Sequence, residues 1–360
     1  MISYMKYQQK ETRCIQVPKE KAEVVRRYLL DHNLLLPHVK IKRTDSSVFF
    51  PITSNDIPSS SILQGSSALM RKMDHYTPPL ESYKSNVPLP QHLKELLPTS
   101  YDIIGDIVLI KLPEELQQYK KDIGHALLLT NPHCKVICSI SPVSGKIRTR
   151  TVEIIAGEQR SLTLHKEYGI NLYVDVQSTF YSPRLAAERK RISTLVKPNE
   201  RVLDMFTGVG PFSIMIAKHA RPQKVIGIDI NTEAIRLARK NISLNKVSDI
   251  VEMLRGDAQQ CPTLFKDIPG FHRIIMNLPF GAYRYVSHAL QCAHSYVIIH
   301  YYDILQDDEI EKRKKMIQTL AHKEKYSLTF KRIQKIKTYS PREFYIGMDI
   351  QAKKNYADVA

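Results

Sequence analysis

Four short polar segments carry side chains that could bind a nucleoside. They contain Asp204, Gly208 and Gly210 in DMFTGVG, Asp229 in GIDI, Asp257 in RGDA and Asn277 in NLP. The glycines allow a tight turn and a close approach of the backbone to a ligand. An acidic side chain at the end of a following strand, here Asp229, can accept hydrogen bonds from two ribose hydroxyls. A further carboxylate, Asp257, could accept one from an adenine amino group.

The glycine turn lacks the pattern that binds a pyrophosphate. Ser213 stands where the third glycine of GxGxxG would fall, and Pro211 suits the first turn of a following helix. Each acid alone could instead cap a helix, and for Asp257 alone this is the more common role. The combination predicts a nucleoside pocket without a phosphate clamp, as S-adenosylmethionine requires.

The segments that carry these residues alternate between short apolar strands and amphipathic helices. The strands are RVLDMF, KVIGIDI, IVEMLRGD, HRIIMNLP and SYVIIHYY. Such alternation predicts a parallel sheet that is covered on both faces, with ligand-binding residues at the carboxyl ends of its strands. Two later stretches, YSLTFKRIQKIKTY and REFYIGMDIQA, could pair as a hairpin at the sheet edge. We therefore predict an α/β protein whose Rossmann-like domain has a mostly parallel seven-stranded sheet.

Two small α+β modules precede this domain. The first combines the strand RCIQVP, a helix over residues 19–31 and a strand-like run at 48–52, and Ser- and Pro-rich linker composition follows it. In the second, the strand-like segments IIGDIVLIKL, KVICSI and TVEIIAG surround the helix YKKDIGHALLLT. The expected organisation is a small domain at 1–56, a linker at 57–95, an α+β domain at 96–162 and the Rossmann-like domain at 163–360.

Composition narrows the class of partner. The 360 residues include 53 Lys and Arg against 36 Asp and Glu, a formal charge of +17, which favours nucleic acid as the partner. The five cysteines are scattered without a CxxC pair, so we expect a reducing compartment and no metal site. No apolar run approaches the roughly 20 residues that span a bilayer, and no signal or transit pattern opens the chain. A cytoplasmic location without a membrane partner is expected.

Several ordered segments resemble a known family. SPRLAAERKRI, VLDMFTGVGPFSIMIAK, GIDINTEAIRLARKNISLN, IIMNLPFGAY and KTYSPREFYIGMD are similar to segments of the archaeal and eukaryal tRNA (guanine-37-N1)-methyltransferases. The likeness extends through LHKEYGINLYVDV and RTRTVEIIAGE to the N-terminal module. It implies a class I methyltransferase that uses S-adenosylmethionine to methylate N1 of guanosine 37. It further implies that the N-terminal module docks on the outer corner of tRNA and that the other domains hold the anticodon loop. An enzyme that encloses one tRNA with three domains can work as a monomer, so a monomer is expected.

The chemistry at guanine needs a base and a group that stabilises negative charge. The N1 proton must leave before N1 can attack a methyl group, and negative charge then builds on O6. The resemblance implies Glu188 as the general base and Arg148 as the cation near O6, although neighbouring Arg150 could take that place. Asn277 can both accept from and donate to the base edge, so we include it among the catalytic candidates.

Further contacts follow from the same resemblance. Arg184 and Glu188 are spaced i, i+4 on a helix that begins near Pro183, a spacing that is also typical of a surface ion pair. Phe280 is expected to pack rather than to contact the base. The predicted cofactor contacts are Arg189, Phe206, Gly208, Asp229, Ile230, Asp257, Ala258, Asn277 and Pro279. The predicted substrate contacts are Phe180, Arg184 and Arg150.

Three other functions remain open. An aminocarboxypropyl transferase of the wybutosine pathway uses the same cofactor, but its segment after the fourth strand departs from Asn-Leu-Pro, so NLP favours methyl transfer. A bifunctional enzyme that also methylates the tricyclic intermediate at C7 is not separable by sequence. A non-catalytic RNA-binding protein with a decayed fold should first lose Asp229, Asp257 and Asn277, and all three are present.

Overall fold

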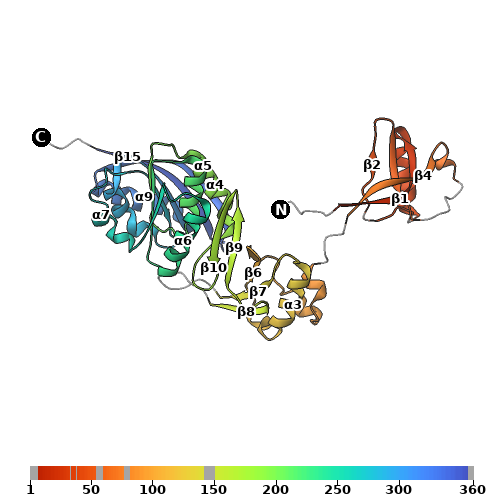
Figure 1. Cartoon of the computed structure of the whole chain (residues 1–360), viewed down its shortest axis with the longest axis horizontal. Coiled ribbons are helices and arrows are strands. Elements are labelled where there is room, and N and C mark those ends of the chain that lie inside the picture. Colours follow the sequence, from red (N-terminus) through yellow and green to blue (C-terminus); the bar gives the residue numbers. More distant parts are fainter. Residues whose placement is uncertain are drawn as a thin grey trace. The chain divides into compact units, whose positions relative to one another are not determined.

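The computed structural model describes residues 7–32, 34–37, 39–53, 60–76, 82–141 and 151–355. The chain divides into two compact units, Met1–Val87 and Pro88–Ala360, whose elements are labelled in Figure 1. We describe each unit by itself.

The first unit is built on a four-stranded antiparallel sheet with the order β2-β3-β1-β4. Its strands are β1 (Tyr7–Pro18), β2 (Lys42–Arg43), β3 (Ser47–Pro51) and β4 (Ser67–Tyr76). Helix α1 (Ala22–Asp31) buries Val25 and Leu29 against Ile15 and Phe50 of the sheet. The strand, helix and strand that the sequence predicts for this module are therefore present, and they form its core.

The structure differs from the predicted linker at residues 57–95. Strand β4 lies within that range and pairs with β1, and Tyr83 and Val87 are buried. The range also holds three short helices, η2 (Ser61–Leu63), η3 (Tyr83–Asn86) and α2 (Gln91–Lys94). The strand sequence SALMRKMDHY lacks a strict alternation of apolar and polar residues, and the composition of its Ser- and Pro-rich flanks dominates the sequence signal.

The second unit begins with a four-stranded sheet of order β5-β6-β7-β8. The strands are β5 (Asp102–Ile104), β6 (Ile107–Ile110), β7 (Val136–Ile140) and β8 (Val152–Gly157). Strands β6 and β7 are parallel and are joined through η4 (Glu114–Tyr119) and α3 (Lys120–Thr130). Ile123 and Leu127 of α3 are completely buried, so this helix contributes to the hydrophobic core. The hairpin of β9 (Leu162–Glu167) and β10 (Ile170–Asp175) follows.

A seven-stranded sheet of order β13-β12-β11-β14-β15-β17-β16 forms the rest of the second unit. The parallel strands are β11 (Arg201–Asp204), β12 (Lys224–Asp229), β13 (Val251–Arg255), β14 (Phe271–Asn277) and β15 (Ala293–Leu305). Strands β16 (Tyr326–Thr338) and β17 (Phe344–Lys354) pair antiparallel at the edge. The predicted α/β fold class, the mostly parallel seven-stranded sheet and its edge hairpin are confirmed.

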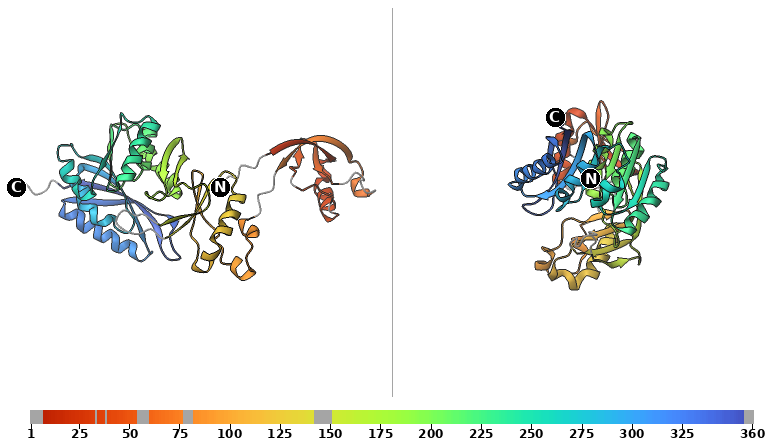
Figure 2. Two further views of the ribbon diagram at one scale, coloured as in Figure 1. Left: turned by 60° about the horizontal axis from the view of Figure 1, so that its bottom comes forward. Right: turned by 90° about the vertical axis from the view of Figure 1, so that its left-hand side faces the viewer.

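Helices lie on both faces of this sheet, as Figure 2 shows in its left view. The longer ones are α4 (Ala186–Leu195), α5 (Pro211–Ala220), α6 (Thr232–Asn245) and α9 (Glu309–Lys323), and the shorter ones are η5 (Pro183–Leu185), η6 (Ala258–Gln260), α7 (Cys261–Leu264), η7 (Ala282–Tyr285) and α8 (Val286–Gln291). One core contains Ile192, Phe212 and Leu237 from α4, α5 and α6, and the other contains Leu290 and Ile317 from α8 and α9. Burial on both faces explains why the central strands are apolar throughout rather than alternating.

The strand order reverses beside β11. From β11 the chain proceeds outward to β12 and β13, and it then returns to place β14 on the other side of β11. Ligands of such sheets bind outside the carboxyl ends of the strands at this reversal. The turns after β11 and β14 therefore meet where the sequence predicts the pocket. Within the described ranges, no helix is both long enough and apolar enough to cross a membrane.

Candidate cofactor and base-binding site

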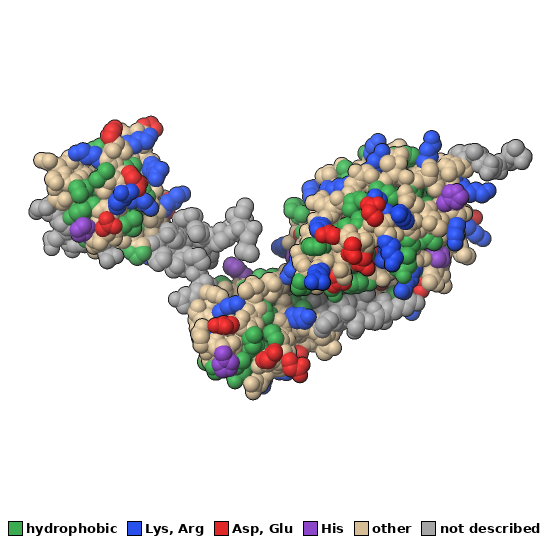
Figure 3. All heavy atoms as spheres, turned by 180° about the vertical axis from the view of Figure 1, so that it is seen from behind, with side chains coloured by type: hydrophobic (Ala, Val, Ile, Leu, Met, Phe, Trp, Pro, Cys, Tyr) green, Lys and Arg blue, Asp and Glu red, His purple; other side chains and the backbone are tan. Residues whose placement is uncertain are grey.

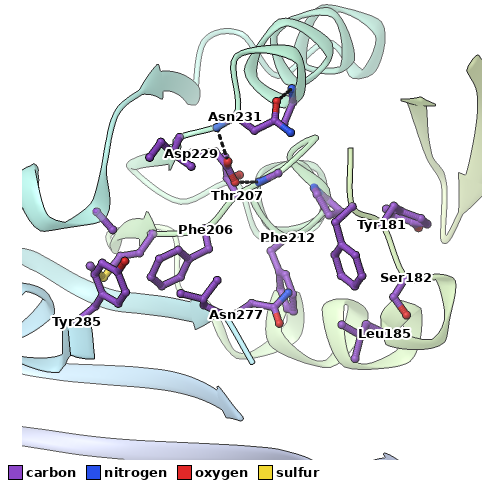
Figure 4. A pocket seen from close by; sticks show the side chains of 18 of the residues that line it. Tyr181, Ser182, Leu185, Phe206, Thr207, Phe212, Asp229, Asn231, Asn277 and Tyr285 are labelled. Carbon is purple, nitrogen blue, oxygen red and sulfur yellow. Dashed lines mark hydrogen bonds between the residues drawn. The ribbon is translucent and has the colours of Figure 1, made fainter. Parts of the chain in front are cut away.

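A pocket lies at the carboxyl ends of β11, β12, β13 and β14 (Figure 4). Residues just after these strands form one side of it, and the segment from Phe180 to Arg189 contributes another. The predicted residues that line it are Phe180, Arg189, Phe206, Gly208, Asp229, Ile230, Asp257, Ala258 and Asn277. Tertiary structure thus brings together nine residues that lie between Phe180 and Asn277 in the sequence.

The turn after β11 provides the backbone of the pocket. Gly208 and Gly210 have φ angles of 55° and 87°, a left-handed conformation that favours glycine. Gly210 precedes α5, whose first residue is Pro211, as the sequence predicts. Asp204, at the end of β11, is buried beneath the turn and accepts a hydrogen bond from the Ser213 hydroxyl at 2.8 Å. Burial raises the pKa of Asp204 to about 6.

Asp229 is the carboxylate that the turn holds in place. Its Oδ2 accepts a hydrogen bond from the Gly208 amide at 2.8 Å, and its Oδ1 accepts one from the Asn231 amide at 2.9 Å (Figure 4). Removal from solvent raises the pKa of this carboxyl group, and the amide hydrogen bonds oppose the rise. Each carboxylate oxygen can accept more than one hydrogen bond. The fixed carboxylate can therefore still accept from two neighbouring hydroxyls.

Asp257 both caps a short helix and lines the pocket. Its Oδ1 accepts from the Gln259 amide at 3.0 Å, and it forms a capping box with Gln260 at the start of η6. The same residue lines the pocket beside Ala258, with Ile230 also on the lining. Capping fixes the carboxylate at the pocket wall, so the structural role supports a binding role here.

The aromatic and apolar lining suits a nucleoside. The Phe206 ring contacts the Tyr285 ring edge-on at 5.1 Å, and both residues line the pocket. Among the described lining residues Arg189 alone is cationic, and its guanidinium is bound to Glu167. The lining thus offers carboxylates for hydroxyl and amino groups but no cation for a phosphate. This donor and acceptor set fits S-adenosylmethionine.

Arg189 forms a buried ion pair that sequence reasoning missed. Its Nε and Nη2 donate to the two Glu167 oxygens at 2.6 Å each, and the Tyr181 hydroxyl also donates to Glu167 at 2.7 Å. The side chains of Arg189 and Glu167 are 2% and 4% exposed. Burial opposes the charge of Arg189, but its hydrogen bonds to Glu167 and the negative charge of that carboxylate outweigh this effect and raise the pKa of Arg189. Glu167 ends β9 between Lys166 and Tyr168, and no apolar run around it in the sequence indicated that it is buried.

Glu188 is buried but does not line the pocket. Its carboxylate accepts from Arg191 at 2.8 and 2.7 Å and from the Tyr302 hydroxyl at 2.9 Å, and Arg332 lies 3.5 Å away. Burial acts to raise the pKa of Glu188, but hydrogen bonding and charge from Arg191, Tyr302 and Arg332 hold it below its ordinary value. The group is therefore an ionised carboxylate at neutral pH.

The surface ion pair between Arg184 and Glu188 does not form. Arg184 instead donates to Asp102 at 2.6 Å, and its side chain is 44% exposed. Glu188 turns inward because α4 packs on the sheet, where Arg191 bridges it to Asp349 at 2.8 Å. His300 contacts the other oxygen of Asp349 at 2.7 Å, so Glu188 ends a chain of polar groups that runs into the core.

Asn277 reaches the pocket from the end of β14. The hydroxyl of Tyr345 donates to its Oδ1. The Tyr345 ring lies 6.1 Å from that of Tyr302, whose hydroxyl bonds to Glu188. Two tyrosines from β15 and β17 thus link Asn277 to Glu188, and neither was among the predicted site residues.

The residues after Asn277 depart from expectation. Pro279 is buried and lies outside the pocket lining. Phe280 is 50% exposed, with a φ of 68°, and its ring packs edge-on against that of Tyr339 at 5.3 Å, so it lies outside the core. The backbone amide of Phe280 donates to the buried Asp303 at 3.0 Å.

Arg148 and Arg150 lie outside the described residues. The described ranges contain no group of three His, Cys, Asp or Glu side chains that could hold a metal ion. All five cysteines are free and buried.

Three family models match the chain in order. The tRNA methyltransferase 5 N-terminal domain matches residues 14–58, the TYW2 N-terminal domain matches 85–160, and the TRM5/TYW2 methyltransferase domain matches 163–329. The chain is thus similar to this family over all of its predicted modules.

Individual relatives match over almost the whole length. The tRNA (guanine(37)-N(1))-methyltransferase Trm5b of Pyrococcus abyssi is 37% identical, with 94% of this chain and 99% of that protein covered. The protein of the same name from Methanocaldococcus jannaschii is 35% identical, with coverages of 95% and 99%. The solved structure of aTrm5 in complex with tRNALeu has a TM-score of 0.71 and 32% identity and covers 95% of this chain and 99% of that one. As its ordered motifs predict, the chain belongs to the family of tRNA (guanine(37)-N1)-methyltransferases.

Proposed function

We propose that this protein transfers the methyl group of S-adenosylmethionine to N1 of guanosine 37 in a tRNA anticodon loop. One observation carries the proposal: a single pocket has the fixed carboxylate of Asp229 on its lining together with Asn277, and two tyrosines link Asn277 to Glu188. A nucleoside cofactor and a target base can meet in such an arrangement.

The cofactor residues are assigned from the lining. Asp229 would accept the ribose hydroxyls and Asp257 the adenine amino group. The apolar side chains of Ile230 and Ala258 would lie against the adenine ring. Phe206 and Gly208 would contact the rest of the molecule, and Arg189 would support the pocket through its pair with Glu167. When bound, S-adenosylmethionine supplies an electrophilic methyl group on a positively charged sulfur.

The base chemistry is assigned to Glu188 and its neighbours. Glu188 would take the N1 proton, since its carboxylate is ionised at neutral pH. Its hydrogen bond with the Tyr302 hydroxyl and its pairing with Arg191 would stabilise and orient it. Because Glu188 lies off the pocket lining, we propose that the target guanine reaches it on the side of Asn277. Arg148 would offset the charge on O6, with Arg150 as the alternative.

The tRNA would be held by charge and by the pocket rim. Lys and Arg side chains are spread over the visible surface of both units, with acidic side chains between them (Figure 3). Such contacts hold phosphates without reading sequence. We assign the first unit, Met1–Val87, to the outer corner of tRNA and the second unit, Pro88–Ala360, to the anticodon loop. Among the described residues, Phe180, which lines the pocket, and the exposed Arg184 would contact the tRNA. Loop bases are commonly unstacked by RNA-binding proteins, which suits position 37.

The proposal is tested with two isotopic forms of the cofactor. Unmodified tRNA transcripts with guanine or adenine at position 37 are incubated with S-adenosylmethionine labelled in its methyl or its carboxyl group, and the nucleosides are analysed. Methyl label in 1-methylguanosine, on the guanine transcript alone, is expected. Carboxyl label in the tRNA would identify an aminocarboxypropyl transferase instead. The absence of 1-methylguanosine under conditions where tRNA binds would refute the proposal.

A tRNA that carries 4-demethylwyosine tests the bifunctional alternative in the same assay, because methylation of that base shows the second activity directly. The cytoplasmic location and the monomeric state stay predictions.

A further inference from the structure

Tyr345 reaches Asn277 across an intervening strand. Tyr345 lies on β17 opposite Ile304 of β15, and Asn277 ends β14 opposite Tyr302 of β15. The Tyr345 side chain is 3% exposed, yet its hydroxyl donates to Asn277 Oδ1. A buried hydroxyl is thus directed at a predicted catalytic amide from two strands away.

The Tyr345 ring is held from several sides. The Tyr302 ring lies 6.1 Å away, and the ammonium group of Lys337 lies 5.2 Å from the centre of the Tyr345 ring. Lys337 itself donates to the hydroxyl of Ser182, a pocket residue, at 3.1 Å. These contacts fix the ring, so the position of its hydroxyl is defined before any substrate arrives.

The hydrogen bond decides which end of the Asn277 amide is available. With Oδ1 engaged by Tyr345, the amide nitrogen is the end left for a ligand, and no acceptor for it is found in the described part of the chain. Guanine carries an acceptor at O6, whereas adenine carries an amino donor at the corresponding N6. An NH₂ group at this point of the site complements guanine and opposes adenine.

We propose that Tyr345 is a positioning residue that holds the Asn277 amide with its NH₂ group toward guanine O6. Tyr345 thereby contributes to the choice of guanine over adenine, and the same donor stabilises the charge that builds on O6 during proton loss. The inference rests on the proposed function, because it assumes that guanine is the target base. The Asn277 amide is then a second hydrogen-bond donor to O6, in addition to the arginine that the family resemblance implies.

The test removes only the hydroxyl, as Tyr345→Phe. Tyr326→Phe is the matched control, because Tyr326 is also 3% exposed in the same sheet and its hydroxyl bonds to the backbone carbonyls of Ala293 and His294 at 3.3 Å. With the guanine-37 transcript we expect kcat of Tyr345→Phe to fall roughly three- to tenfold, as for one lost hydrogen bond, with little change in KM. The adenine-37 to guanine-37 rate ratio should rise. Tyr326→Phe should retain both values.

A double-mutant cycle separates positioning from packing. If Tyr345 acts through the amide, Tyr345→Phe should change kcat no further in an Asn277→Ala background. An equal fold-loss in both backgrounds would overturn the proposal, as would wild-type kcat and base preference in the single variant. Failure of the wild-type enzyme to form 1-methylguanosine would instead refute the proposed function, so the two failures are distinguishable.

Discussion

Asp204 at the end of β11 is the carboxylate for which the fold predicts a measurable pH effect. The side chain is 1% exposed, Ser213 donates to one oxygen, and the other has no hydrogen-bond partner among the described residues. Burial raises its pKa from 3.8 to about 6. The change to make is Asp204→Asn, which keeps the shape of the side chain and removes its ionisation.

The sign follows from proton binding. Between the two pKa values the folded protein binds more protons at Asp204 than the unfolded chain does, so folding stability falls as pH rises through this window. Below both pKa values the ionisation of Asp204 has no effect on folding stability. Above about pH 6 the full destabilisation is present. A difference of about 2 units corresponds to about 3 kcal/mol, of which about 2 kcal/mol develops between about pH 4.5 and pH 7.5.

The assay compares free energies of unfolding of the variant and the wild-type protein by urea denaturation across this range. The difference in stability between Asp204→Asn and wild type should move by about 2 kcal/mol in favour of the variant as pH rises. Asp249→Asn, at an exposed position, controls for the loss of one surface carboxylate. A difference that stays constant within about 0.5 kcal/mol would show that Asp204 is not held in a desolvated state.

Three further predictions concern the pocket and its support. Glu188→Gln should lower the rate of methyl transfer at least about 100-fold. The Kd of this variant for S-adenosylmethionine, measured by calorimetry, should stay unchanged because Glu188 does not line the pocket. A parallel loss of cofactor affinity would exclude Glu188 as the general base. Asp229→Ala should raise the Kd for the cofactor by roughly 10- to 100-fold because charge-assisted hydrogen bonds are lost. The affinity for tRNA, measured by filter binding, should be retained. An unchanged cofactor Kd would show that Asp229 does not bind the ribose hydroxyls. Arg189→Met should lower the free energy of unfolding by about 3–5 kcal/mol because Glu167 is then buried without its charge partner. Adding Glu167→Leu should recover much of that loss, and a further drop would contradict the ion-pair explanation.

Local patterns in the sequence were sufficient to predict the sheet and the pocket residues at the carboxyl ends of its strands. The central strands are apolar on both faces. A polar residue ends the apolar run of each strand, as Asp204, Asp229 and Asn277 do. Parallel strands place their carboxyl ends at one edge, so pocket residues could be predicted without any knowledge of side-chain contacts. The ordered motifs also predicted the family that the comparisons bear out.

Contacts between distant strands were decided by tertiary structure alone. Glu188 pairs with Arg191 rather than Arg184 because packing of α4 sets which face turns inward. Tyr345 reaches Asn277 from 68 positions later in the chain, an encounter that depends on the register of three strands. Sequence periodicity reports which face of an element is buried, but not which side chain of another strand lies opposite it. The pocket residues that follow the strands were therefore visible in the sequence, whereas the orientation of the Asn277 amide emerged only from the fold.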